Sequence, residues 1–441
     1  MNRLIWLLIL AIGYTCPLTA QKNFSQSRPA NLSDSALLDL VQKQTFRYFW
    51  DFAHPVSGLS RERSNADFGY GHETVTIGGT GFGVMSVIIA SERKWISRDT
   101  AARFLLKMVN FLLKADSYHG AFPHWMNGST GKTIPFSRKD DGADIVETSY
   151  LLQGLLCVRQ YFNHDNNTER ELRNRIQWIW EGMEWDWFTK GGEEVLYWHW
   201  SPNNGWSMNF PIRGFNECLI VYVLAASSNS NPVSDKVYHR GWAQSNFFKN
   251  GKVFYNHTLP LGFDYGGPLF FSHYSFLGLD PRGLKDQYAD YWAQNSSHTM
   301  INHDHCVNNP RQFKGYGANC WGLTACDTYD GYDAYSPTND GGTIAPTAAL
   351  SAFPYTPEYS MLALKHFYYD LGDKLWSEYG FIDAFNESKN WYAKSHLAID
   401  QGPIIVMIEN YRSGLMWKLF MSCPEIKDGL KKLGFESPQI K

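Results

Sequence analysis

The densest group of acids lies in the segment 138–150, which reads RKDDGADIVETSY. Asp144 and Glu147 are three residues apart, so on a helix they share one face. Asp140 lies one turn earlier, where the dipole of a helix start favours a negative charge. The next residues, 151–158, are almost wholly apolar, which predicts a deeply packed helix. Acids at the entry of a buried helix are costly unless they serve a site or have partners. The alternative is simple capping, with Asp144 as N-cap and Glu147 completing a capping box.

A second acid, Glu217, also precedes an apolar helical stretch, 219–226. Arg213 lies four residues before it, so an ordinary ion pair on the helix surface is the alternative interpretation. The preceding segment 197–206, YWHWSPNNGW, is unusually aromatic for a loop in contact with solvent. Flat aromatic rings suit the apolar C–H faces of sugars.

Two carboxylates from different helix starts are what glycoside hydrolysis needs. One acid with a raised pKa protonates the leaving oxygen, and the other carboxylate activates water or attacks the sugar directly. Aromatic residues make up 16% of the chain, with 17 Trp, 25 Tyr and 28 Phe. Many of these rings fill the core, so the composition indicates a sugar site only together with the acids.

The elements that position these acids follow a repeated helical pattern. After 37–50, further helices are expected near the following ranges: 81–94, 98–115, 144–163, 168–185, 213–228, 234–249, 268–277, 283–296, 344–352, 357–371, 401–420 and 425–433. Strand-like alternation is almost absent, and no fixed period indicates an open solenoid. Long loops rich in Trp, Asn, Asp, Gly and His alternate with shorter ones. The pattern predicts an all-α fold, a closed toroid of paired helices with its long loops gathered at one end.

Three other groups of residues partly match known binding motifs. His303 and His305, on an extended segment, would point the same way, but further metal ligands at a recognisable spacing are missing from the sequence. Asp327, Asp330, Asp333 and Asp340 depart from the spacing of a calcium loop. The glycine-rich run 78–83 lacks the preceding strand of a dinucleotide fingerprint. We therefore expect no metal and no cofactor.

The N-terminus predicts export. Arg3, the apolar run 4–14 and the small residues before Gln21 form a signal peptide over 1–20, followed by a polar leader, 21–31, and one domain, 32–441. The run is too short to span a membrane, and the residues before Cys16 make a poor lipoprotein signal. A net charge of −3 gives no support for binding nucleic acid. The other six cysteines form no disulfide framework; only Cys320 and Cys326 are close enough in sequence to suggest a pair.

Several motifs resemble a known family. The segments 321–327 (WGLTACD), 345–347 (APT), 399–403 (IDQGP) and 409–414 (ENYRSG) resemble the glucoamylase-like domain. Within that group the chain is similar to glycoside hydrolase family 144, the bacterial β-1,2-glucanases, from about Leu38 to Lys432. The resemblance implies an (α/α)6 barrel and hydrolysis of β-1,2-linked glucose chains with inversion at the anomeric carbon.

The resemblance also implies roles for the acids. It singles out Asp140, Asp144, Glu147 and Glu217, and Asp400 is a further acid at a helix start. We interpret Glu217 as the general acid and favour Asp140 or Asp144 over Asp400 as the base, with Glu147 orienting a sugar or a water. The expected substrate contacts, for each of which burial against the barrel rim is the alternative, are Arg61, Trp125, Trp198, Trp200, Trp206, His303 and Trp321.

The sequence therefore predicts a monomeric β-1,2-glucan hydrolase, either endo-acting or releasing sophorose from chain ends. The alternatives are a glucosidase of another linkage and a periplasmic glycan-binding protein without activity. A uronic acid lyase would need a positively charged cleft, whereas this chain concentrates acids in its loops.

Overall fold

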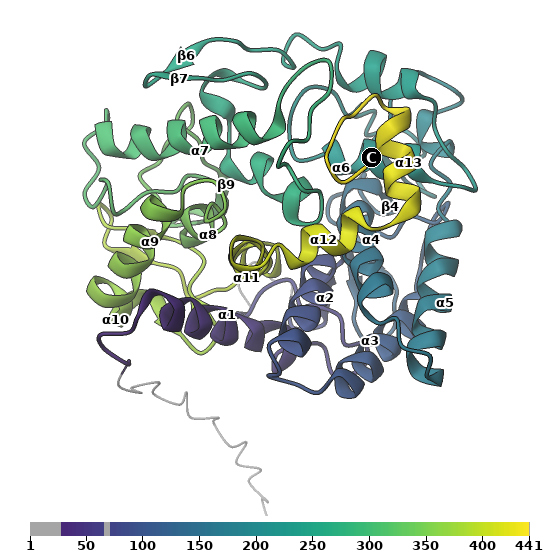
Figure 1. Ribbon diagram of the computed structural model, residues 1–441, viewed down its shortest axis with the longest axis horizontal. Helices are drawn as coiled ribbons and strands as arrows, with labels where there is room; N and C mark the ends of the chain where they lie inside the picture. Colours follow the sequence, from purple (N-terminus) through teal and green to yellow (C-terminus); the bar gives the residue numbers. More distant parts are fainter. Residues whose placement is uncertain (1–27, 66–70, 441) are drawn as a thin grey trace, which may run out of the picture. The chain divides into compact units, whose positions relative to one another are not determined.

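The computed structural model describes residues 28–65 and 71–440, and Leu32–Lys441 form one compact unit. The predicted signal peptide and the first part of the polar leader lie outside the described residues. Helices dominate the unit (Figure 1). They are α1 Asp34–Trp50, α2 Ile77–Glu92, α3 Arg98–Leu112, α4 Ile145–Tyr161, α5 Asn167–Glu181, α6 Leu219–Ser227, α7 Tyr291–Asn308, α8 Pro346–Leu350, α9 Pro357–Lys365, α10 Gly372–Leu375, α11 Ala398–Arg412, α12 Leu415–Met421 and α13 Pro424–Lys432.

Shorter helical segments complete the helical part. They are the 3-10 helices η2 Trp187–Thr189, η4 Asp264–Gly266, η5 Leu269–Ser272 and η6 Tyr274–Leu277, and the π-helical segments η3 Val237–Trp242 and η7 His366–Asp370. The expected helix at 283–296 lies instead at α7, 291–308. Asp290 caps its start by accepting a hydrogen bond from the Ala293 N–H, and the helix runs through His303 and His305, where an extended segment was expected.

Buried and half-buried helices alternate along the chain. In α2 and α4 the residues 77–91 and 145–158 are all buried, whereas α3 and α5 expose one face. A helix that is apolar on all sides must pack on all sides, and an amphipathic one covers it from outside. Accordingly, α2 packs between α4 and α11, while α3 packs on α5 and α1 on α11 (Figure 1).

Glycines set the distance between α2 and α4. A Cβ added at Gly81 would lie 2.2 Å from the carbonyl oxygen of Tyr150, and one at Gly154 would lie 2.2 Å from that of Gly81. Only glycine permits backbones to approach so closely. The glycine-rich run that begins at Gly78 therefore serves helix packing, and it places the first turns of α2 and α4 side by side.

The strands are two to four residues long and pair the loops. They are β1 Thr74–Thr76, β2 Trp125–Asn127, β3 Thr133–Ile134, β4 Ala143–Asp144, β5 His199–Trp200, β6 Val253–Phe254, β7 His257–Thr258, β8 Ala325–Thr328, β9 Gly331–Ala334, β10 Trp376–Ser377, β11 Gly380–Phe381, β12 Phe385–Asn386 and β13 Trp391–Tyr392. One sheet has the order β1-β2-β3, and β4 pairs with β5. Because β1 ends where α2 begins and β4 ends where α4 begins, these pairings fix loops over the starts of the buried helices.

Within the described residues, the fold is constrained neither by disulfide bonds nor by helices that span a membrane. All six cysteines there are buried and free, so Cys320 and Cys326 do not pair in this structure. Over the same residues, none of the helices combines the length and the hydropathy that crossing a bilayer requires.

Candidate active site

A cavity of about 240 Å³ lies over the starts of the buried helices. Thr76 reaches it from the residue before α2, Glu147 from the first turn of α4 and Glu217 from just before α6. Leu397 and Ile399 reach it from the start of α11. Since helix starts carry partial positive charge, carboxylates are favoured there. Among the residues that the structure describes, three carboxylates line the cavity: Glu62, Glu147 and Glu217.

Asp144 is fully buried and has a structural task. Its Oδ1 accepts hydrogen bonds from the N–H groups of Val146 and Glu147 at 2.9 and 3.0 Å, which makes it the N-cap of α4. Its Oδ2 lies 3.0 Å from Nδ1 of His124. Burial raises the pKa of Asp144, but the His124 hydrogen bond and the charge of His199 outweigh it and hold the pKa below its ordinary value.

His124 is the cation of this acidic group. Burial lowers its pKa, but the carboxylates of Glu147, Asp144 and Asp140 outweigh burial and raise the pKa to about 9. Asp140 is buried, with its Oδ1 3.4 Å from Nδ1 of His199. Thus the capping predicted as an alternative is present, and the same acids also hold an imidazolium beside the cavity.

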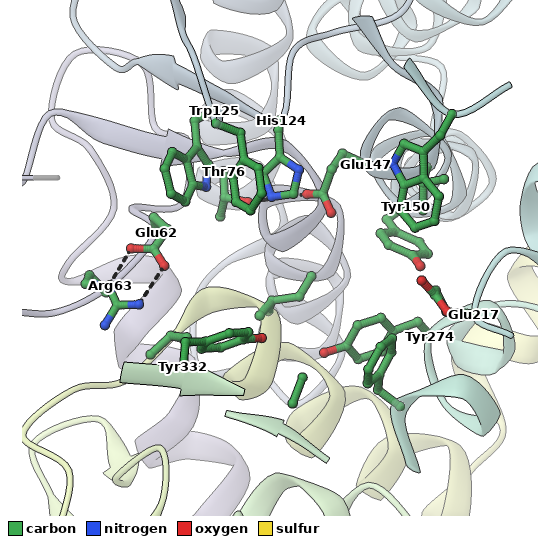
Figure 2. Close-up of a pocket in the computed structure, with 17 residues that line it drawn as sticks. Glu62, Arg63, Thr76, His124, Trp125, Glu147, Tyr150, Glu217, Tyr274 and Tyr332 are labelled. Carbon is green, nitrogen blue, oxygen red and sulfur yellow. Dashed lines mark hydrogen bonds and ion pairs between the residues drawn. The ribbon is translucent and has the colours of Figure 1, made fainter. Parts of the chain in front are cut away.

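Glu147 faces the cavity. Its Oε2 accepts a hydrogen bond of 2.8 Å from the N–H of Gly78 and one of 3.4 Å from the hydroxyl of Thr76. Burial raises its pKa, and the charge of His124 is the largest opposing influence. Figure 2 shows its carboxyl next to the His124 ring. Glu147 is thus a fixed carboxyl with one edge held by the start of α2.

Glu217 has the environment of a proton donor. It is 8% exposed, and its Oε2 is buried without a hydrogen-bond partner among the described residues. Burial is the main cause that raises its pKa to about 7, with a further contribution from the charges of Glu147 and Asp144. In Figure 2 its carboxyl faces the hydroxyl of Tyr150. Such a carboxyl keeps its proton in about half of the molecules at pH 7 and in most of them at lower pH, as general acid catalysis requires.

A second acidic network borders the opposite side of the cavity, and of its acids the sequence indicated only Asp400 as a catalytic candidate. Arg63 binds the carboxylate of Glu62 at 2.8 Å (Figure 2). It also binds that of Asp327 at 3.0 Å. Asp383 and Asp400 are buried beside each other, and burial raises the pKa of both carboxyls, with the charge of Asp383 raising that of Asp400 further. The signal for this network in the sequence was the adjacent pair Glu62 and Arg63. An acid next to an arginine is common in any sequence, so the pair did not indicate a site.

Aromatic rings form much of the cavity wall. The lining includes Trp125, Phe136, Trp198, Tyr274 and Tyr332. Figure 2 shows the hydroxyls of Tyr274 and Tyr332 pointing toward each other across the cavity. Apolar faces interrupted by hydroxyls and carboxyls match the alternating C–H and O–H surfaces of a sugar. Two of the predicted contact residues, Trp125 and Trp198, therefore line the cavity.

The remaining predicted contacts lie elsewhere. Trp321 is fully buried in the core, with the ring of His303 packed edge-on against it at 5.3 Å. Arg61 donates hydrogen bonds to the carbonyl oxygens of His72 and Phe52. Trp200 and Trp206 belong to an aromatic group beside the cavity, described below. Trp321 packs in the core. The sequence alone does not show whether a tryptophan packs in the core or stacks on a sugar.

Two groups of side chains could converge on a metal ion: His124, Asp140 and Asp144, and Cys320, His366 and Glu387. The first set fits a metal poorly, since His124 is protonated and uses Nδ1 to bind Asp144. His303 and His305 bind Asp304 and Asp340 instead of forming a two-histidine arm. Asp327 pairs with Arg63, and among the described residues neither candidate metal group contains Asp327, Asp330, Asp333 or Asp340.

Comparison with known proteins gives a consistent result. The family model described as "Putative glucoamylase" matches residues 209–424. A crystal structure from Bacteroides uniformis with the same description is 60% identical and covers 94% of this chain and 100% of that chain, with a TM-score of 0.92. An endo-β-1,2-glucanase from Chitinophaga pinensis, solved with sophorotriose and glucose, is 55% identical over 93% of this chain and 100% of that chain, with a TM-score of 0.90.

The chain belongs to glycoside hydrolase family 144.

A curated member of the group, an exo-β-1,2-glucooligosaccharide sophorohydrolase acting at the non-reducing end, comes from Parabacteroides distasonis. It is 42% identical to the family 144 chain described here, over 94% of this chain. The chain spans 60% of the length of that relative. These relatives include both an endo- and an exo-acting protein, so membership leaves the mode of cleavage open.

Proposed function

We propose that this protein hydrolyses β-1,2-glucan with inversion, using Glu217 as the general acid. The observation that carries the proposal is the Glu217 carboxyl in the cavity wall, with burial as the main cause of a pKa near 7. The names of the Chitinophaga and Parabacteroides relatives supply the linkage. A protonated carboxyl at this position can donate its proton to the oxygen of the leaving sugar.

Glu147 is the carboxylate that activates water. It lines the cavity with Glu217, whereas Asp140 and Asp144 do not line it and are engaged by His199 and His124. The N–H of Gly78 and the charge of His124 both favour its ionised form. Asp140 and Asp144 then act as positioning residues that hold His124. Asp400, buried beside Asp383 behind the wall, is the second candidate for the base.

The fold proposed for this function is an (α/α)6 barrel. Six outer segments, α1, α3, α5, η3, α7 and α9, alternate along the chain with six inner ones, α2, α4, α6, η5–η6, α8 and α11. The inner helices are the buried ones, as a barrel core requires. In this arrangement the starts of the inner helices gather at one end, where the cavity lies.

The first experiment incubates the purified protein with linear β-1,2-glucan and follows product size over time. A ladder of oligosaccharides indicates endo cleavage, and sophorose alone from the outset indicates exo action. Proton NMR of the first product reports the anomer, and inversion of a β-linkage gives the α-anomer. If β-1,2-glucan yields no product while another glucan does, the linkage is wrong; if no glucan is cleaved, the protein binds glycans without cleaving them.

Variants separate the roles of the acids. Glu217→Gln should lose activity on glucan but retain more on an aryl sophoroside whose good leaving group needs no proton. Glu147→Gln should lose activity on both, and azide should restore it by replacing the activated water. Asp400→Asn is the matched test of the alternative base. Azide rescue of Asp400→Asn alone would transfer the role of base to Asp400.

Export and a monomeric state complete the proposal. The charged n-region and apolar run over 1–20 support export to the periplasm or the medium. The mass of the protein recovered from the periplasmic fraction tests cleavage before Gln21, and its elution volume in size-exclusion chromatography tests the monomer.

A further inference from the structure

A second cleft, of about 690 Å³, lies outside the catalytic cavity; we name it the Trp187 cleft. Its walls include Glu184, Asp186, Trp187, Thr189, Lys190 and Trp206, from the turn at η2 and the aromatic loop that precedes α6. Trp206 was expected from the sequence to contact sugar, and the catalytic cavity does not use it. The feature that needs explanation is an exposed aromatic surface within a polar cleft.

Trp187 is exposed yet firmly held. Its side chain is 39% exposed, and the ring of His119 stacks on it with centroids 3.7 Å apart and planes 12° apart. Nδ1 of His119 lies 2.8 Å from Oε2 of Glu184, which fixes the orientation of the imidazole. Trp206 lies beside Trp187, with ring centroids 6.4 Å apart. A large apolar ring kept in place at the surface is suited to binding the apolar face of a ligand.

The polar groups of the cleft indicate a neutral ligand rich in hydroxyls. Glu184 is 48% exposed, and Asp186 is exposed as well. Lys190 is the cationic lining residue, and its Nζ donates a hydrogen bond of 2.7 Å to Oδ1 of Asn209. Acceptors that outnumber cations disfavour a phosphate or a uronic acid. Carboxylates beside indole rings suit the hydroxyl groups and C–H faces of glucose units.

One short segment of the chain links the Trp187 cleft to the catalytic cavity. Trp187 packs edge-on against Trp200, with centroids 5.9 Å apart. Trp200 follows Trp198 by two residues, and Trp198 lines the catalytic cavity. Trp198 lies immediately before β5 and Trp200 ends it, so the two residues are at most about 7 Å apart along the chain. A chain that leaves the cavity past Trp198 therefore reaches the Trp187 cleft after a short distance.

We propose that the Trp187 cleft binds the part of a long β-1,2-glucan chain that extends beyond the catalytic cavity. The identity of the glucan rests on the proposed function; the cleft itself is a separate sugar-binding surface. Its occupancy favours long chains over short oligosaccharides, because only a long chain reaches both places at once.

Trp187→Ala tests the cleft, with Trp178→Ala as its matched control. Trp178 is 55% exposed on α5, lies under Arg175 and lines neither cavity. For Trp187→Ala we expect kcat/KM on long β-1,2-glucan to fall about tenfold, because one sugar–aromatic contact is lost, while kcat/KM on short sophoro-oligosaccharides is unchanged. Trp178→Ala should change neither value. An equal loss on both substrates, or no loss on the polymer, overturns the proposal.

Binding is measured separately in a protein that does not cleave. Affinity electrophoresis in gels containing long β-1,2-glucan compares Glu217→Gln with the double variant Glu217→Gln/Trp187→Ala, and the double variant should be retarded less. Equal retardation contradicts the cleft. If wild-type protein cleaves no β-1,2-glucan, the proposed function fails, and retardation still reports on the cleft. Trp187→Leu keeps an apolar side chain against His119 and replaces the alanine variant if the latter has a lowered Tm.

Discussion

The N–H of Gly78 donates a hydrogen bond of 2.8 Å to Oε2 of Glu147, which joins the first turn of α2 to the first turn of α4 at the cavity. The bond depends on the absence of a side chain at position 78. A Cβ there would lie 2.5 Å from Oε2 of Glu147 and 2.9 Å from the ring of Tyr150. The glycines that pack the two helices thus also place the carboxyl proposed to activate water.

Gly78→Ala should therefore reduce activity more than it reduces stability. We expect Glu147 to shift and kcat/KM on β-1,2-glucan to fall at least about tenfold, because a displacement near 1 Å is costly for catalysis. Overpacking should lower the free energy of unfolding by about 1–3 kcal/mol. Steady-state kinetics and urea unfolding measure the two effects.

Gly317→Ala is the control for that substitution, since a Cβ at Gly317 meets nothing within 4 Å. It should leave activity and stability nearly unchanged. Full activity in Gly78→Ala would show that Glu147 does not need the position seen here, and would remove the argument for it as the base.

Glu217→Gln should make the protein more stable at alkaline pH. The pKa of Glu217 is raised to about 7, so its contribution to stability is complete below its unfolded-state pKa near 4.5 and is lost as pH rises through 7. Ionising this carboxyl in the folded state costs about 3 kcal/mol, at about 1.4 kcal/mol for each tenfold change in proton affinity. Urea unfolding at pH 8 should show up to that gain, and at pH 4 little change. A loss of stability at pH 8 would contradict the burial of an unpartnered carboxyl.

The proton on the Glu217 carboxyl also sets the alkaline limit of activity. Glu217 must be protonated to act as the acid. We therefore expect kcat/KM to fall about tenfold for each pH unit above about 7. A pH–rate profile on short sophoro-oligosaccharides measures this limit. With an aryl sophoroside whose leaving group needs no proton, the decline should weaken or disappear. An alkaline limit that is identical for both substrates would assign it to another group.

Parts of the site could be predicted from sequence because they follow local rules. Asp144 and Glu147 share a helix start by their spacing, and the apolar run after them predicts the buried α4. Glu62 and Asp383 could not be predicted, because their importance depends on contacts between distant segments. Asp383, for example, meets Asp400 only when β11 and β12 pack against the start of α11.

The aromatic residues show the same limit. Trp198 and Trp321 both lie in loops rich in polar residues, yet Trp198 lines the cavity and Trp321 is fully buried. The helix α7 was placed eight residues too early at its start, 283 instead of 291, because 283–290 contains apolar residues at helical spacing but forms a turn that ends at the cap Asp290. Long-range packing overrides such local patterns.

His124→Asn should move the acid limit of activity to higher pH. His124 carries a raised pKa of about 9, and its positive charge is the largest influence that lowers the pKa of Glu147 against burial. Without that charge, Glu147 binds its proton more tightly and is ionised only at higher pH. The pH–rate profile should therefore narrow from its acid side. The alkaline limit near 7 should change little, because His124 is not among the causes that set the pKa of Glu217. His366→Asn is the matched control, since His366 binds Asp370 and lines neither the cavity nor the Trp187 cleft. An acid limit that stays fixed in His124→Asn would show that Glu147 is not the group whose ionisation activates water.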